Sequence, residues 1–251
     1  MLETIGIGSL PHSQRELALQ FSFRADIPYL PELPKFSPLE YMIPLALSGV
    51  PGVTFDSSGF PKLDQQEWKL HQKSFSLVVE ECLRKGDHSR FLPNHVCLNP
   101  FLYDINEKKI KKAKIQITGP LSIQWLLKTD EFFSFLMAKA GALLEEFIQS
   151  CPDSKLLFLI DEPGLFAFNP NNPKHLLDLQ NLKFFIQFIK KFNVEVGIHC
   201  CSNTAWEHVL NLPIDVLSID FALSAKKLMQ ASNFESFIQS KKLILGIVPT
   251  N

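Results

Sequence analysis

The sequence lacks an excess of charge of either sign. Lys and Arg number 25 and Asp and Glu number 26, so the formal net charge is -1. Proteins that bind nucleic acid or anionic membranes usually present a basic surface, and this balance argues against both kinds of partner. Long apolar runs are also missing: none reaches the roughly 18 residues that a membrane span needs. Residues 1–12 have neither the basic nor the long apolar part of a secretion signal, so we expect a cytoplasmic protein.

An even set of cysteines is lacking as well. The chain has 5 Cys, which together with the missing secretion signal favours reduced thiols over a disulfide framework. A Gly-x-Gly-x-x-Gly loop is absent, since "GIGSLPH" places Pro11 and His12 where the following helix would begin. This departure argues against a dinucleotide-binding fold.

What the sequence does contain is an alternation of short β-type apolar runs with longer helical patterns, which is typical of βα units and a parallel sheet. A hairpin is predicted over 53–64, where Gly59 supplies a turn residue. The predicted strands are 4–9, 26–30, 114–119, 156–163, 194–199, 215–221 and 243–248, and the predicted helices are 14–23, 65–85, 131–150, 176–192, 204–210 and 233–240.

The fold class predicted from this order is α/β, as a TIM-type (β/α)8 barrel that lacks its last βα unit. No linker or repeat marks a boundary, so we expect a single barrel domain over 1–251 that is C-terminally short, because the last strand runs almost to Asn251. A barrel one strand short leaves open sheet edges. The alternative is an open, doubly wound sheet.

Residues capable of chemistry follow several of the predicted strands. The carboxyl ends of barrel strands meet at one mouth, where the active site lies, so these residues are expected to converge. Among them, His12 and Asp161 are the candidate catalytic residues. The full set is Ser9, His12, Asp161, Glu162, His199, Cys200, Cys201 and Asp220.

The His-x-Cys pair in "GIHCCSN" has the character of a metal site. Side chains alternate along a strand, so His199 and Cys201 can point the same way while Cys200 points away. Nitrogen and thiolate ligands suit zinc, and Asp220 can add an oxygen ligand. The alternative is that the small cysteines simply pack under the sheet.

Two further segments allow a binding or a structural interpretation. In "IDEP", Asp161 or Glu162 can hold a substrate ammonium, or both can cap a helix or pair with a cation. In "GSLPH", Ser9 can bind a substrate carboxylate near a helix N-terminus or serve as an ordinary N-cap.

Taken in order, a series of segments resembles the motifs of the cobalamin-independent methionine synthase catalytic domain. The nearest resemblance is to the short, single-domain relatives within the uroporphyrinogen decarboxylase and methionine synthase superfamily, and it spans nearly the whole chain. The fold it implies is a TIM barrel. The segments are "IGIGSLPH", "DIPYLPELPKFSPLEYM", "ITGPLS", "IDEPGL", "GIHCCSNTAW", "IDVLSIDF" and "GIVPTN".

The resemblance implies a zinc ion that binds a homocysteine-like thiol as the thiolate. It assigns the metal to His199, Cys201 and Asp220, where the synthases carry glutamate at the last position. It assigns amino-acid binding to the segment Ile7, Gly8 and Ser9, and ammonium binding to Asp161. The chain departs from the pattern because it stops at Asn251, before the C-terminal cysteine ligand. It is therefore expected to be a fragment or a shortened relative, with weak zinc binding and little methyl transfer. Its open sheet edges are expected to be covered by a partner subunit in a homo-oligomer or by rearranged local structure.

The leading hypothesis is a methionine synthase-like methyltransferase of methionine biosynthesis. Its partners would be a small-molecule thiol and a folate or corrinoid methyl donor. A tetrapyrrole decarboxylase is the second candidate, but its pocket would need arginines, and none of those present follows a predicted strand. The third is a degenerate barrel that only binds. The arginines are Arg15, Arg24, Arg84 and Arg90.

Overall fold

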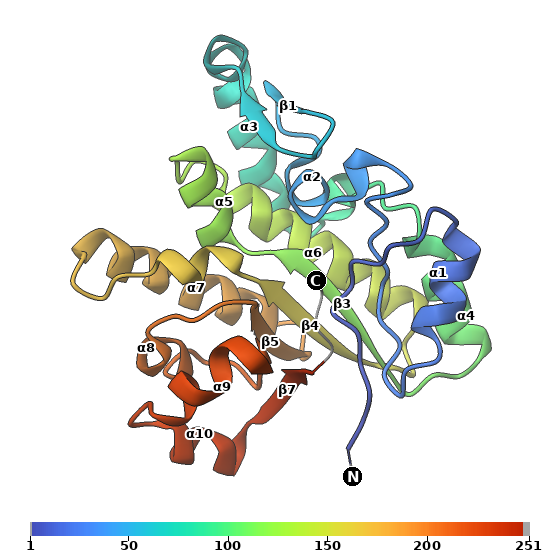
Figure 1. Ribbon diagram of the computed structural model, residues 1–251. Coiled ribbons are helices and arrows are strands. Elements are labelled where there is room, and N and C mark those ends of the chain that lie inside the picture. Colours follow the sequence, from blue (N-terminus) through green and yellow to red (C-terminus); the bar gives the residue numbers. More distant parts are fainter. Residues whose placement is uncertain (1, 248–251) are drawn as a thin grey trace. The chain divides into compact units, whose positions relative to one another are not determined.

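The computed structural model describes residues 2–247 (Figure 1). The chain consists of two compact units. Unit 1 comprises Met1–Ile117 and Thr129–Leu157, and unit 2 comprises Thr118–Lys128 and Phe158–Asn251. Both units are therefore discontinuous in sequence. Residues 118–128 of unit 2 interrupt unit 1, and residues 129–157 of unit 1 interrupt unit 2.

A five-stranded parallel sheet follows the order of the chain, β3-β4-β5-β6-β7. Its strands are β3 (Lys112–Thr118), β4 (Lys155–Asp161), β5 (Glu195–Cys200), β6 (Val216–Asp220) and β7 (Lys242–Gly246). The interiors of β3 and β4 are almost entirely buried, as strands covered on both faces should be.

These strands confirm the predicted α/β class and five of the predicted strands, the last of which was predicted to end at Val248, outside the described residues. A doubly wound sheet reverses its strand order near the middle, and the described strands show no such reversal. Over residues 2–247 the strands also do not close into a barrel.

The two strands predicted at 4–9 and 26–30 form single parallel bridges instead of regular ladders. Ile5 bridges to Ile27, Ser9 to Glu32, and Tyr29 to Lys114 of β3. Proline at 28 and 31 lacks the N–H that a ladder requires, and the side chain of Lys114 donates to the carbonyls of residues 6 and 7. The segments thus lie parallel in chain order beside β3 without becoming full strands.

Unit 1 contains the predicted hairpin, in which β1 (Val53–Phe55) pairs antiparallel with β2 (Pro61–Leu63). It also holds η1 (Pro38–Glu40), η2 (Ser89–Phe91) and the helices α1 (Arg15–Ser22), α2 (Met42–Leu47), α3 (Gln65–Lys85), α4 (Leu98–Glu107) and α6 (Phe133–Ser150).

Helix α3 has the predicted bounds because both ends carry strong signals. The side chain of Asp64 accepts from the N–H groups of residues 66 and 67, and Gly86 ends the helix in the left-handed conformation. Helices α2 and α4 were not predicted, because each contains a proline, Pro44 or Pro100. Proline usually indicates the end of a helix, but it is tolerated in the first turn, where both of these lie.

Unit 2 contains η3 (Pro163–Ala167) and the helices α5 (Pro120–Leu127), α7 (Pro173–Lys190), α8 (Trp206–Leu210), α9 (Phe221–Met229) and α10 (Phe234–Ser240). Helix α5 was missed because its first five residues are all buried, so the sequence has no amphipathic period. Within residues 2–247, no helix combines the length and apolar character required for crossing a bilayer.

Candidate functional site

Three of the predicted site residues lie at the carboxyl ends of the neighbouring strands β4, β5 and β6. Asp161 ends β4, His199 is the penultimate residue of β5, and Asp220 ends β6. The N–H of Glu162 donates to the carbonyl of His199 at 2.9 Å, which links the ends of β4 and β5. The predicted placement of these residues at neighbouring strand ends is therefore confirmed.

The His-x-Cys segment alternates as a strand end should. Cys200 is buried, and its thiol donates to the carbonyl of Ser202 at 3.1 Å, whereas Cys201 is exposed. His199 is half-buried, and its Nδ1 lies 3.0 Å from the hydroxyl of Ser218 on β6. Of the two adjacent thiols, only that of Cys201 is therefore accessible to a ligand at this edge.

The Cys201 thiol lies within electrostatic range of two carboxylates. Partial burial raises its pKa most, and the charges of Asp161 and Asp220 raise it further. A thiol beside two carboxylates keeps its proton at neutral pH, because a thiolate there would add a third negative charge. A bound cation reverses this balance and favours the thiolate.

The donors at this edge have the chemistry that zinc requires, namely imidazole, thiolate and carboxylate. One carboxylate is already engaged, because Asp220 Oδ1 accepts from the N–H of Leu223 at 2.9 Å and caps α9. Over residues 2–247, no group of three or more His, Cys, Asp and Glu side chains is arranged to hold a metal ion. A zinc site formed by His199, Cys201 and Asp220 stays a prediction.

Glu162 is fully buried and caps α5. Its Oε1 accepts from the N–H of Leu121 at 3.0 Å, and its Oε2 accepts from the N–H and the hydroxyl of Ser122 at 2.8 and 2.6 Å. Burial raises the pKa of Glu162 to about 7, against the opposing effect of these hydrogen bonds. Both oxygens are therefore occupied by structural bonds, and a role in substrate binding stays a prediction.

In unit 1 the segment Ile7-Gly8-Ser9 lies beside Glu32, an acidic residue that was not among the predicted site residues. The hydroxyl of Ser9 donates to Glu32 Oε2 at 2.9 Å. Ser9 does not cap a helix, since α1 has Gln14 at its N-cap. Gly8 has φ +139°, and a Cβ there would lie 2.0 Å from the side-chain nitrogen of Gln116, so only glycine fits.

Two buried polar residues of β3 support this segment. Lys114 donates to the carbonyls of Gly6 and Ile7 and to Gln116 Oε1, while Gln116 Nε2 donates to the carbonyl of Leu30. The sequence carries a signal for them, because Lys114 and Gln116 alternate with apolar residues and thus share one face of the strand. Burial raises the pKa of the neighbouring Glu32, and Ser9, Gln116 and Lys114 oppose that effect.

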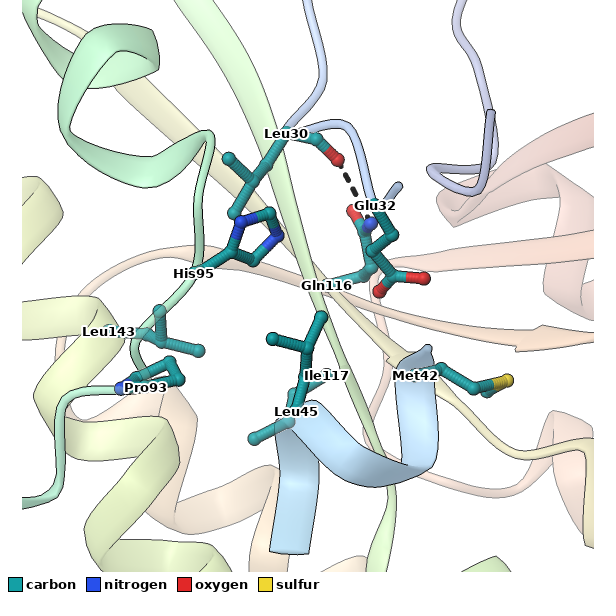
Figure 2. Close-up of a pocket in the computed structure, with 9 residues that line it drawn as sticks. All are labelled: Leu30, Glu32, Met42, Leu45, Pro93, His95, Gln116, Ile117 and Leu143. Atoms are coloured by element: carbon teal, nitrogen blue, oxygen red, sulfur yellow. Dashed lines mark hydrogen bonds between the residues drawn. The ribbon is translucent and has the colours of Figure 1, made fainter. Parts of the chain in front are cut away.

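A small cavity adjoins this cluster (Figure 2). Its free space of about 10 Å³ matches a single water molecule. His95 lies in its wall with Nδ1 3.4 Å from Glu40 Oε2, and burial lowers the pKa of His95 to about 3, so the ring is neutral. The lining residues are Leu30, Glu32, Met42, Leu45, Pro93, His95, Gln116, Ile117 and Leu143.

His12 is half-buried, and its ring centroid lies 5.6 Å from that of Phe21. His12 and Ser9 belong to unit 1, whereas Asp161 belongs to unit 2. The prediction that Ser9 and Asp161 line one mouth, and the catalytic roles of His12 and Asp161, stay predictions.

No model of a known protein family matches the chain, and no curated protein matches it. The functional assignment therefore rests on the residues and their arrangement.

Proposed function

We propose that the chain is a methionine synthase-like protein that binds a small, homocysteine-like thiol and prepares it for methylation by a folate or corrinoid donor in the cytoplasm. The proposed fold is a (β/α)8-type barrel. Support for it comes from the parallel strands in chain order and from the bridged segments 4–9 and 26–30, which extend the same order beside β3.

The observation that carries the proposal is the gathering of thiol, imidazole and carboxylate groups at the carboxyl ends of β4, β5 and β6. Cys201 is the accessible thiol, and Asp161 and Asp220 lie within its electrostatic range. His199 is half-buried on β5, where the contact of its Nδ1 with the hydroxyl of Ser218 on β6 orients the imidazole ring. When bound by His199, Cys201 and Asp220, zinc would supply a Lewis acid that lowers the pKa of a substrate thiol.

The remaining residues have binding and orienting roles in this proposal. Asp161 supplies a buried carboxylate for the substrate ammonium, at a strand end where a charge-assisted hydrogen bond is strong. Ser9 is exposed, and its backbone N–H would donate to the substrate carboxylate, while its hydroxyl donates to Glu32 and fixes the side chain. Lys114 holds the backbone of Gly6 and Ile7, so the binding segment is ordered before a ligand arrives.

Metal analysis of protein purified without chelator, followed by calorimetric titration with homocysteine, tests the proposal. We expect zinc to be bound weakly or substoichiometrically, and we expect homocysteine to bind more tightly with zinc than after its removal. Replacing Cys201 with serine should lower zinc affinity by about tenfold or more, because thiolate is a far better zinc ligand than a hydroxyl group. The matched control is Cys200→Ser, whose thiol is buried and bonded to Ser202.

Equal zinc loss in the two cysteine variants would contradict the assignment, since the neighbours differ in which of them faces the ligand. Absence of homocysteine binding with and without zinc would favour the alternative of a barrel that binds another ligand without catalysis. Asp161→Asn should weaken homocysteine binding by about tenfold while leaving zinc content unchanged.

A further inference from the structure

A buried lysine and a serine of unit 1 form a close pair outside the site described above. Lys139 on α6 is 1% exposed, and its Nζ lies 2.6 Å from both the hydroxyl and the carbonyl oxygen of Ser48. Ser48 follows the last residue of α2, and α6 packs against α2, α3 and η2 (Figure 1). The pair thus lies between packed helices.

Ser48 also lines a pocket of about 600 Å³, large enough for a small-molecule ligand. Phe75, Val78 and Phe91 give the pocket an apolar wall, while His71 and Arg90 add polar groups. A Cβ placed on the next residue, Gly49, would meet no atom within 4 Å, so the chain is open to approach immediately after Ser48.

We propose that Ser48 and Lys139 form a nucleophile and general-base pair that hydrolyses esters of short apolar acyl groups bound in this pocket. A nucleophile activated by a base within hydrogen-bond reach is the arrangement that acyl transfer requires, and serine with lysine is one of its known forms. The site is independent of the zinc and thiol chemistry proposed for the sheet.

The reaction balances with water as the only co-reactant. Ser48 Oγ attacks the ester carbonyl carbon while Lys139 Nζ takes the hydroxyl proton, and that proton then passes to the departing alkoxide. Water next attacks the acyl-serine ester as Nζ takes one of its protons. The second tetrahedral intermediate collapses to release a carboxylic acid, and the proton on Nζ returns to Ser48 Oγ.

The form of Lys139 needed for this reaction is the neutral amine, which has two N–H groups and one lone pair. One N–H can continue to donate to the Ser48 carbonyl while the lone pair accepts from the Ser48 hydroxyl, which then gives up the 3.3 Å bond that it donates to the Leu45 carbonyl. Burial lowers the pKa of Lys139 to about 7, which makes the neutral amine abundant near neutral pH. The bond from Nζ to the Ser48 carbonyl caps the end of α2, and the contact between Nζ and the Ser48 hydroxyl is the one that general-base chemistry uses.

A fluorophosphonate probe tests the pair directly, because it forms a covalent bond only with an activated hydroxyl. The full-length protein would be labelled in the presence of EDTA and the modified residue located by mass spectrometry, with p-nitrophenyl butyrate hydrolysis measured in parallel. We expect the label on Ser48 of the wild-type protein. Lys139→Met should reduce both labelling and hydrolysis by about a hundredfold or more, as is usual for loss of a general base.

Ser74→Ala is the matched control, since Ser74 lines the same pocket but its hydroxyl donates to the carbonyl of His71. This variant should retain wild-type labelling at Ser48. Wild-type protein that carries no label on Ser48 would overturn the proposal, and this result does not depend on the folding of any variant. Labelling of Ser48 that persists in folded Lys139→Met would also overturn it, because the lysine would then have only a structural role.

Discussion

Replacing Glu162 with glutamine isolates the energetic cost of a buried carboxylate at the start of α5. Burial raises the pKa of Glu162 from the ordinary value of 4.5 to about 7. Between these two values the folded protein holds a proton that the unfolded chain releases. The folded state is therefore destabilised as the pH rises from 4.5 to 7, by about 3 kcal/mol in total.

Glutamine resembles the protonated acid in shape, but it does not titrate. Its carbonyl can take the place of Oε2 and accept from the N–H and the hydroxyl of Ser122, whereas its amide takes the place of Oε1 and loses the bond from the N–H of Leu121, at a cost of about 1 kcal/mol. At pH 5, Glu162→Gln should match the wild-type free energy of unfolding to within about 1 kcal/mol. At pH 8 the variant should be more stable by about 2 kcal/mol, since the lost hydrogen bond offsets part of the gain.

Urea denaturation of both proteins at several pH values measures this difference, in which contributions from all other groups cancel. The control is Glu81→Gln, at an exposed glutamate paired with Lys85 on α3, which should reproduce the wild-type pH profile. A variant that is less stable than wild type at pH 8 would refute the reasoning. It would mean that the three hydrogen bonds and the start of α5 stabilise the charged carboxylate more than burial disfavours it.

Two further predictions concern protonation and exposure in the native protein. Because burial lowers the pKa of His95 from 6.5 to about 3, the wild type should lose about 2 kcal/mol of stability relative to His95→Gln as the pH falls from 6.5 to 4.5, as followed by urea denaturation. With maleimide at pH 7, peptide mapping should find Cys201 labelled in the folded protein, more slowly than a free thiol because its pKa is raised. The three buried thiols should react only on unfolding; these are Cys97, Cys151 and Cys200.

Elements with strong local signals were predictable from the sequence. Strands β3 to β7 are short, mostly apolar runs, and α3 has a capping aspartate before it and a glycine after it. Helix α5 was not predictable from periodicity, since its start is surrounded by protein and carries no polar face. The segments 4–9 and 26–30 were predicted as strands from composition, but they form only single bridges. Pro28 has no N–H for a ladder, and the side chain of Lys114 donates to the carbonyls of residues 6 and 7.

The candidate site was predictable where a polar residue interrupts an apolar strand at its end, as Asp161, His199 and Asp220 do. Glu32 was missed because it lies between two prolines in a loop-like segment, and its partner Ser9 is 23 residues away. Glu162 was selected as a ligand-binding residue, but local sequence cannot show that its carboxylate reaches 40 residues back to Ser122. Contacts made by tertiary packing therefore decide which polar residues remain available to a ligand.

The discontinuity of the two units has a consequence for the order of events during synthesis. Helix α5 belongs to unit 2, yet it leaves the ribosome before the second segment of unit 1. Its capping carboxylate follows Leu121 by 41 residues, which at 5–20 residues per second is a delay of about 2 to 8 s. During that interval a mostly apolar helix has no partner from the later part of its own unit, so its apolar side chains stay exposed in the nascent chain.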